Sequence, residues 1–460
     1  MIIKKNARLT VEIQDVTAKG FGVCHQEGLA LFIDGGLPGD RLLIQIVKVK
    51  TRYAYGKILE IITSSPARIK SPCSVSDKCG GCQWQHCRYE TQLEFKKRIV
   101  TDTIERIGGI ANPPVADVIG MEKPFRYRNK ALFPTVPVGK NDFAIGMYAP
   151  RSHRIVEVAD CLIQHESHIK ILAALKEHMR RKKITAYDEA THKGLMRHIM
   201  IRTSRNEIMV VLVINGSQVP GESELADSFA NLGVSTSLVN CNEAKGNVVL
   251  GEKFRVLRGR GYIYETLGEL RFQLSPGSFF QVNPIQAKVL YDIAVSQAGL
   301  DGNQSVIDAH CGVGGVALYA ASRVQQIIGV DIVPAAIQDA EKNAALNNIS
   351  NARFILGAAE DIIPGIIDGG EGRLIPEFPL HPKSTIVFLD PPRKGCDPVL
   401  LDALVAARIQ KIVYISCDPA TLARDIKRLV SGGYKLTAVQ PVDMFPFTGK
   451  VETSCLLEMD

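Results

Sequence analysis

Residues 305–322 read SVIDAHCGVGGVALYAAS, and this stretch decides the fold of the C-terminal part of the chain. A short run of β-branched and apolar residues precedes a glycine-rich turn, and a helix-like run follows the turn. Glycines at such a turn let a ligand approach the backbone closely. Strand, glycine turn and helix in this order are typical of the first unit of a doubly wound α/β sheet.

The same alternation of strands and helices continues toward the C-terminus. IIGVD (327–331) is a predicted strand, and PAAIQDAEKNAALNN (334–348) is a predicted helix. Three further predicted strands are STIVFLDPPRKG (384–395), KIVYISCDP (411–419) and VETSCLLEM (451–459). The pattern predicts a doubly wound parallel sheet. A stretch rich in Gly and Pro, 361–384, is expected to be an irregular insertion.

The rest of the chain has a different character. Residues 1–65 alternate apolar and polar positions in short runs separated by turn signals such as DGGLPGD (34–40), which predicts a small β-barrel. Residues 120–270 mix strand-like runs with one helix-like run around 166–182, which predicts an α+β pattern without a parallel-sheet signature. YETQLEFKKRIVTDTIERIGG (89–109) has helical periodicity and ends at two glycines, which predicts a helix. This helix is expected to pack on the C-terminal domain.

Composition limits the class of protein. With 460 residues, 46% hydrophobic and 22% charged, the chain is expected to form two or three globular domains. The net charge of +7, from 55 basic and 48 acidic residues, is compatible with a polyanionic partner. No apolar run of about 18 residues is present, so no membrane span is expected. The N-terminus MIIKKNARLTVE lacks the apolar core of a secretion signal, which favours a cytoplasmic protein.

Eleven cysteines are many for a chain in a reducing compartment, and they indicate metal ligation or catalysis before disulfides. Cys73, Cys79 and Cys82 form a C-x5-C-x2-C motif beside two glycines. Thiolates at this density suit zinc or an iron–sulfur cluster, and each needs a fourth ligand, for which Cys87 and Cys161 are candidates. Spacing alone does not separate iron from zinc.

Acidic residues end two of the predicted strands. Asp331 is the last residue of the predicted strand that comes after the glycine turn. A carboxylate at this strand end can accept hydrogen bonds from both hydroxyls of a ribose. The order Gly-x-Gly-Gly over 312–315 lacks the third spaced glycine of the dinucleotide fingerprint. This favours S-adenosylmethionine over a nicotinamide dinucleotide, with a plain tight turn as the structural alternative. Asp390 precedes two prolines, which make either a rigid site loop or only a turn.

Cys417 lies at the tip of a predicted strand in KIVYISCDPATLARD (411–425), where α/β sheets keep reactive groups. A lone Cys is more often a small core residue, and a lone Glu such as Glu452 is usually solvated. Their meaning therefore depends on the motifs that accompany them.

Five motifs together resemble the RNA uracil-5-methyltransferase family, and more narrowly its 23S rRNA members that carry a TRAM domain and a 4Fe-4S cluster. They are SPGSFFQVN (275–283), DAHCGVGGV (308–316), FLDPPRKG (388–395), YISCDPATLARD (414–425) and MFPFTGKVETSCLL (444–457). The resemblance covers nearly the whole chain. It implies a multidomain protein with an OB-like TRAM β-barrel over 1–65, a central α+β iron–sulfur domain over 66–270, and an α/β doubly wound class I methyltransferase domain over 271–460.

The resemblance implies Cys417 as the nucleophile and Glu452 as the proton acceptor. Carbon 5 of uracil is a poor nucleophile toward a sulfonium methyl group. A thiolate that adds at carbon 6 turns the ring into an enolate, whose carbon 5 takes the methyl group. A base then removes the proton from carbon 5 so that the thiol leaves by elimination. A free thiol titrates near ~8.5, so the site must favour the thiolate or pass its proton to a neighbour.

The resemblance also implies residues that bind S-adenosylmethionine: Gln281, His310, Gly315, Asp331 and Asp390. His310 stands where the family has Tyr or Phe, and Gly315 stands where members have Asn or Thr. Two further departures are Ala358, near a common Asp or Asn, and Lys450, which replaces a common His. The implied cluster ligands are Cys73, Cys79, Cys82 and, as the distant fourth, Cys161.

We therefore expect a monomeric cytoplasmic enzyme that makes 5-methyluridine in RNA, with 23S rRNA preferred as the substrate. A tRNA methyltransferase acting on the T-loop uridine is the first alternative. A non-catalytic RNA-binding protein with the same fold is the second.

Overall fold

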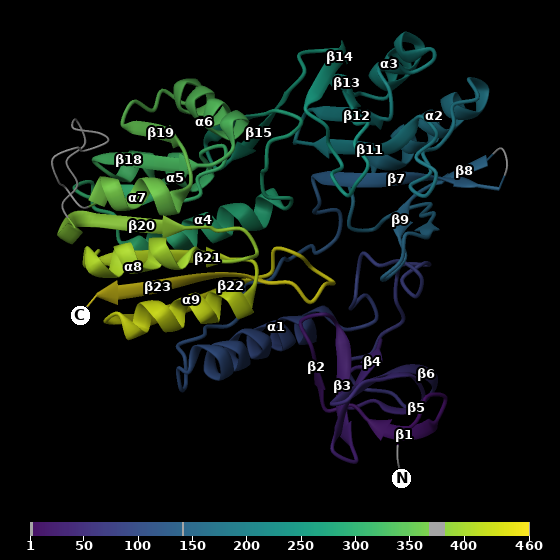
Figure 1. Ribbon diagram of the computed structural model, residues 1–460, viewed down its shortest axis with the longest axis horizontal. Coiled ribbons are helices and arrows are strands. Elements are labelled where there is room, and N and C mark those ends of the chain that lie inside the picture. The colour runs from purple at the N-terminus through teal and green to yellow at the C-terminus, as the bar shows by residue number, and fades with distance from the viewer. Residues whose placement is uncertain (1–2, 140–141, 368–381, 460) are drawn as a thin grey trace.

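The computed structural model describes residues 3–139, 142–367 and 382–459, which form three large sheets, two two-stranded sheets and the helices around them. The N-terminal sheet lies at the lower right of Figure 1, the central sheet at the upper right, and the large C-terminal sheet at the left. In the part of the chain described, no helix is both long and apolar enough to cross a membrane.

The N-terminal sheet has six strands in the order β1-β5-β6-β4-β3-β2. They are β1 (Arg8–Glu12), β2 (Asp15–Val16), β3 (Phe21–Gln26), β4 (Leu29–Asp34), β5 (Arg41–Val49) and β6 (Tyr53–Thr63). Alternate residues of β5 are fully buried, which gives this sheet its own core. Among the described strands β1 and β2 are the two edges, and β2 spans only two residues. The predicted closed barrel is therefore a half-barrel, because β2 is too short to complete a ladder.

The central sheet also has six strands, in the order β14-β13-β12-β11-β7-β8. They are β7 (Lys130–Val138), β8 (Asp142–Ile145), β11 (Met196–Thr203), β12 (Ile208–Ile214), β13 (Thr236–Cys241) and β14 (Lys253–Arg258), with β9 (Met147–Tyr148) and β10 (Ile155–Val156) in a separate hairpin. Helices α2 (Ser167–Arg181) and α3 (Glu222–Asn231) pack on it. Strands β12 and β13 are parallel and joined through α3, which the sequence analysis missed. Helix α3 spans only ten residues, with Leu225, Ala226 and Phe229 buried, so its periodic signal is short.

The C-terminal sheet has seven strands in the order β19-β18-β17-β20-β21-β23-β22. They are β17 (Ser305–Asp308), β18 (Gln326–Asp331), β19 (Ala352–Leu356), β20 (Thr385–Leu389), β21 (Lys411–Ser416), β22 (Tyr434–Val442) and β23 (Glu452–Met459). The first five are mutually parallel, which confirms the doubly wound α/β fold. The prediction of a wholly parallel sheet is wrong at one edge, where β23 runs antiparallel to both β21 and β22.

Helices cover both faces of this sheet because its strands are apolar on both sides. In β20, Ile386 and Phe388 join one core, while Val387 and Leu389 join the other. Helices α4 (Pro284–Ala298), α5 (Gly315–Ala320) and α6 (Pro334–Leu346) share the first core; α7 (Ala359–Ile367), α8 (Pro398–Ala406) and α9 (Pro419–Ser431) share the second. The stretch 361–384, predicted as an irregular insertion, begins inside α7, and its residues 368–381 lie outside the described residues.

Two elements connect the C-terminal sheet to the rest of the molecule. Helix α1 (Tyr89–Thr103) continues through one π-helical turn to Gly109, whose φ of +72° ends it. This helix lies beside α9 and β22, although both are far from it in sequence (Figure 1). The hairpin of β15 (Ile263–Leu267) and β16 (Leu270–Leu274) packs on α4 and α6.

Candidate active site

A cavity of about 630 Å³ lies at the carboxyl ends of the parallel strands. In the C-terminal sheet the chain runs outward from β17 through β18 to β19, and then returns to β20 on the other side of β17. Ligands of open α/β sheets bind at this kind of reversal. The residues that end or follow β18, β20 and β21, namely Asp331, Asp390 and Cys417, all line the cavity.

Cys417 is held at a tight strand-to-helix turn. It follows β21 directly, and the next residue, Asp418, caps α9 by accepting a hydrogen bond from the Ala420 backbone N–H at 2.9 Å. The Asp418 N–H donates to the Ser416 hydroxyl oxygen at 3.1 Å, and Pro419 occupies the first helical position. The polar residues and the proline around Cys417 therefore build the turn that presents its half-buried thiol to the cavity.

Glu452 reaches the same cavity because its strand is antiparallel. It is the first residue of β23, so it lies at the sheet edge where β21 ends. Thr453 is opposite Ser416 in the ladder, so Glu452 and Cys417 are the next residues beyond this pair on their strands. The Glu452 side chain is buried and lines the cavity with Cys417.

The surroundings of the cavity raise the pKa of its thiol and of two of its acids. Burial, together with the Glu452 and Asp390 carboxyls, raises the pKa of Cys417 to about 11, and the Arg393 guanidinium opposes this. Burial and Asp390 raise the pKa of Glu452 well above its usual range, while Arg393 and Lys450 oppose this. Burial alone raises the pKa of Asp390 to about 7. A thiol and an acid in this state can exchange protons with a substrate without leaving two charges buried together.

Four of the five residues expected to bind the cofactor line the cavity: Gln281, His310, Asp331 and Asp390. The Asp331 carboxylate accepts hydrogen bonds from the backbone N–H of Gly312 at 2.9 Å and of Val333 at 2.8 Å, which ties β18 to the glycine turn. Burial lowers the pKa of His310 to about 4, so its ring is neutral. Its Nδ1 is buried without a hydrogen-bond partner within the described residues.

Gly315, the fifth residue, is not brought into this cavity. It lies in the first turn of α5, and a β-carbon placed there would come 2.8 Å from the Tyr291 hydroxyl oxygen. The space for a larger side chain is thus filled by a tyrosine from α4. Ala358, by contrast, does line the cavity, and so does Lys450.

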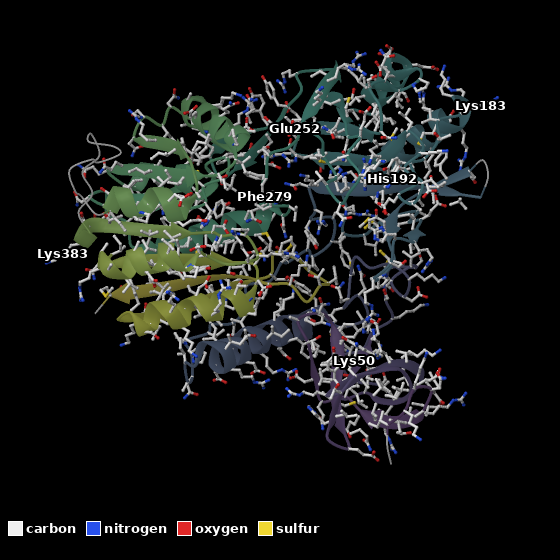
Figure 2. The ribbon with its side chains drawn as sticks, viewed as in Figure 1. Lys50, Lys183, His192, Glu252, Phe279 and Lys383 are labelled. Carbon is white, nitrogen blue, oxygen red and sulfur yellow. The ribbon has the colours of Figure 1, made fainter. Side chains whose placement is uncertain are left out.

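Several cavity residues were not predicted. Phe279 is 66% exposed and points from the Phe-Phe pair of SPGSFFQVN toward the space between the C-terminal and central parts (Figure 2). Arg393 lies in FLDPPRKG, in which the sequence analysis named only Asp390. An arginine three residues from a candidate site acid is a local sequence signal for a cation in the same site. Phe445 and Arg128 also line the cavity. The sequence gives no local signal for Arg128, because it comes from the central part of the chain.

The loop between β22 and β23 is fixed by segments from the opposite end of the chain. Buried Lys96 of α1 pairs with the Asp443 carboxylate, which also accepts from the Tyr89 hydroxyl at 2.7 Å. The Phe447 carbonyl accepts hydrogen bonds from the backbone N–H of Gln83 at 2.9 Å and of Trp84 at 3.0 Å. Phe447 has a φ of +66°, which only such a clamp makes tolerable for a bulky residue. Glu452 therefore takes its position partly from α1 and from the cysteine-rich segment.

Three thiols of the cysteine-rich segment, Cys73, Cys79 and Cys82, line one small cavity together with the distant Cys161. The Gly81 N–H donates to the Cys79 sulfur at 3.4 Å, and Gln85 Nε2 donates to the Cys82 sulfur at 3.6 Å. Cys87 is packed elsewhere, in a core with Trp84 and Phe95. Among the described residues no group of three His, Cys, Asp or Glu side chains is arranged to hold a single metal ion.

Comparisons with known proteins agree with this geometry. The model of the tRNA (uracil-5-)-methyltransferase family matches residues 89–460, and the TRAM domain model matches residues 4–59. Uncharacterized RNA methyltransferases of Halalkalibacterium halodurans and of Clostridium tetani are each 43% identical over 99% of this chain, covering 98% and 97% of those proteins. The crystal structure of Pyrococcus abyssi tRNA (uracil-54, C5)-methyltransferase in complex with S-adenosyl-L-homocysteine is similar with a TM-score of 0.76 and 26% identity, over 98% of this chain and 100% of that one.

Proposed function

Because the chain belongs to the RNA uracil-5-methyltransferase family and carries a TRAM domain, we propose that it methylates carbon 5 of a uridine in 23S rRNA with Cys417 as the nucleophile. Its methyltransferase activity on RNA and its dependence on S-adenosylmethionine follow from the family. The choice of RNA and the roles of individual residues are our proposal. The observation that carries it is that Cys417 and Glu452, from two strands, line one cavity with Asp331 and the glycine turn.

In the proposed reaction the Cys417 sulfur bonds to carbon 6 of the flipped uracil, and the electron pair of the C5=C6 bond moves toward the O4 carbonyl. Burial favours the protonated thiol, so its proton must first pass to solvent, and Glu452 must be in its ionised form when it acts. After carbon 5 carries the methyl group, Glu452 takes the carbon 5 proton and the C6–S bond breaks, which restores the thiolate. S-adenosylmethionine supplies an electrophilic sulfonium methyl group when bound.

We assign the cofactor to four residues of the cavity. Asp331, already oriented by two backbone N–H groups, is placed to accept the ribose hydroxyls. His310 is neutral and can stack on a ring, and its buried Nδ1 lacks a partner within the described part of the chain. Gln281 and Asp390 supply polar atoms on either side of the glycine turn.

We also propose that Cys73, Cys79, Cys82 and Cys161 hold a 4Fe-4S cluster. Two observations support this: all four thiols line one cavity, and amide N–H groups donate to two of the sulfurs. A 4Fe-4S cluster takes four thiolates, and these four thiols line the same cavity. Methyl transfer needs no electron, so the cluster would fix the segment that clamps Phe447. We further propose domain boundaries near residues 65 and 270, and a monomeric cytoplasmic enzyme.

A tRNA T-loop uridine is the second candidate substrate, favoured by the similarity to the Pyrococcus abyssi tRNA enzyme. The four-cysteine segment together with the TRAM domain favours 23S rRNA, since the resemblance ties that combination to the rRNA members. Mapping 5-methyluridine in 23S rRNA and tRNA from cells with and without this protein separates the two. Loss of one rRNA site supports the proposal, and loss of the T-loop site alone contradicts it. A non-catalytic RNA-binding protein would change neither.

A further inference from the structure

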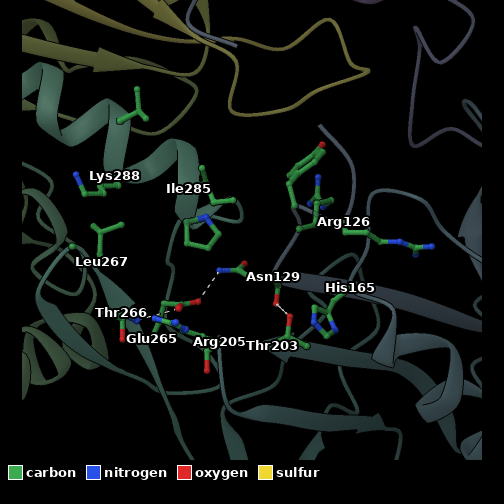
Figure 3. Close-up of a pocket in the computed structure, with 16 residues that line it drawn as sticks. Arg126, Asn129, His165, Thr203, Arg205, Glu265, Thr266, Leu267, Ile285 and Lys288 are labelled. Atoms are coloured by element: carbon green, nitrogen blue, oxygen red, sulfur yellow. Dashed lines mark hydrogen bonds between the residues drawn. The ribbon is translucent and has the colours of Figure 1, made fainter. Parts of the chain in front are cut away.

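A second cavity, of about 570 Å³, lies next to the one that contains Cys417. Its walls come from the start of α4, from the turn between β15 and β16, and from the end of β11, so both the C-terminal and the central parts build it (Figure 3). The segment 126–129 closes it between these walls. None of the reaction proposed above uses this space.

The rim of this second cavity is cationic. Arg126, Arg128, Arg205 and Lys288 all line it. Arg126 is paired with Asp160 at 2.6 Å and Lys288 with Asp292 at 2.7 Å, whereas no described acidic side chain pairs with Arg205. Arg128 contacts the Tyr127 hydroxyl, and no described acidic side chain pairs with it either, so the charges of Arg128 and Arg205 are not neutralised by a described carboxylate.

The one acidic group that lines the second cavity is already occupied by donors of the chain. Glu265 is buried, its carboxyl accepts from the Thr266 N–H at 3.0 Å and from Asn129 Nδ2 at 3.4 Å (Figure 3), and burial raises its pKa. It therefore opposes an incoming anion little.

The same cavity has an uncovered apolar wall. Ile285, the second residue of α4, is 63% exposed, while Val289 in the same lining is half-buried and Leu267 is buried. Apolar surface beside unpaired arginines fits a ligand that has a flat ring on one side and a negative charge on the other. A nucleotide has this chemistry, with a base that packs on apolar side chains and a phosphate that binds arginine.

Arg128 belongs to both cavities and is the wall between them. Its Nε is buried and has no hydrogen-bond partner in the described part of the molecule. An unsatisfied buried donor is destabilising, and a phosphate oxygen would satisfy it. A phosphate on Arg128 would have one nucleotide on each side of it, one in each cavity.

We propose that the second cavity binds one nucleotide of the substrate RNA, adjacent to the uridine that enters the cavity of Cys417, with the linking phosphate on Arg128. This inference rests on the proposed function, since it requires a uridine at Cys417. The proposal adds a second unstacked base to the bound RNA. Changing or removing this base should change the rate of methylation.

The test uses the full-length protein and an RNA hairpin that spans the mapped uridine, with single abasic substitutions at the two positions on each side. For the wild type, we expect one abasic position to lower kcat/KM by about tenfold to a hundredfold, because stacking on a protein contributes on that scale. Ile285→Glu should lower kcat/KM on the intact hairpin similarly and should lose the sensitivity to that abasic position. Glutamate near a helix N-terminus is favourable, so this exposed substitution should leave the fold intact.

A second variant and matched controls accompany it. Arg205→Ala should weaken hairpin binding and reduce the slope of log Kd against log salt by about one. The control positions Val248, which is 65% exposed, and Lys245 line neither cavity. Val248→Glu and Lys245→Ala should therefore behave as the wild type. Additive effects of Ile285→Glu and every abasic position overturn the second-nucleotide site while the proposed function stands. A wild type that neither methylates the intact hairpin nor forms an adduct with its 5-fluorouridine form overturns both.

Discussion

Two of the cavities described above are lined by thiols, and the groups around the sulfur atoms differ between them. Cys417 stands alone on a rigid turn between β21 and α9, beside two carboxyls and the guanidinium of Arg393. In the other cavity, three thiols of the loop 73–82 and the distant Cys161 lie beside one another and beside amide N–H donors. Burial raises the thiol pKa in both places, to about 11 for Cys417 and about 12 for Cys82.

The difference teaches that burial alone does not determine what a cysteine does. In the four-thiol cavity, after burial, the further causes that raise the pKa of Cys82 are other thiols, and bound iron would remove that repulsion by taking all of them as thiolates. At Cys417 the opposing charge comes from one arginine, and the acids nearby can give or take a proton. One arrangement suits permanent ligation, and the other suits a bond that forms and breaks in each turnover.

The largest expected effect comes from removing the single thiol. Cys417→Ala should lower kcat by more than about 10⁴-fold, because no other group can form the bond to carbon 6. It should also form no adduct with RNA that contains 5-fluorouridine, measured by a shift in denaturing gels. Cys241→Ala, another half-buried cysteine, is the control and should be fully active. Adduct formation by Cys417→Ala would mean that the nucleophile lies elsewhere.

Glu452→Gln should separate formation of the bond from its breakage. The amide cannot accept the carbon 5 proton, so turnover should fall by about 10²–10⁴-fold. The adduct with ordinary uridine RNA should then accumulate and be visible by mass spectrometry of the protein. A variant that turns over slowly and never accumulates adduct would place the proton acceptor at another residue.

The four-thiol cavity is tested by a pair of neighbouring cysteines. Cys82→Ser should lower the iron content from about four atoms per chain toward zero and bleach the brown colour of anaerobically purified protein. It should also lower the urea midpoint, since Phe447 and the β22–β23 loop lose support. Cys87→Ala, in a separate core, should keep both iron and colour. Equal iron in the two variants, or stoichiometric zinc in the wild type, would break the comparison.

The smallest expected effect is electrostatic. With a pKa near 11, the thiolate fraction of Cys417 rises tenfold for each pH unit between pH 7 and 9, so the rate of adduct formation should rise with pH. Arg393 lowers this pKa, so Arg393→Gln raises it and leaves less thiolate at any given pH. We expect about tenfold slower trapping by 5-fluorouridine RNA at pH 8. Lys394→Gln, which removes a cation from the adjacent position, should leave the profile unchanged.

Much of this site follows from local sequence. The glycine turn, Asp331, Asp390 and Cys417 each stand at the end of a strand that its own residues predict, so the parallel sheet brings them to one edge. What the sequence analysis missed depends on distant pairing. The antiparallel direction of β23, which brings Glu452 to Cys417, cannot be inferred from the periodicity of one strand. Arg128 joins two cavities only after the central and C-terminal parts have met.

The salt bridge between Lys96 and Asp443 joins residues that are 347 positions apart. Almost the whole polypeptide must therefore be synthesised before α1 can contact the β22–β23 loop. A chain that stops short of that loop leaves Lys96 of α1 without its counter-ion. Nascent or truncated copies should be unable to modify RNA, however well their first half has folded. We therefore expect methylation of RNA only from chains that include the β22–β23 loop.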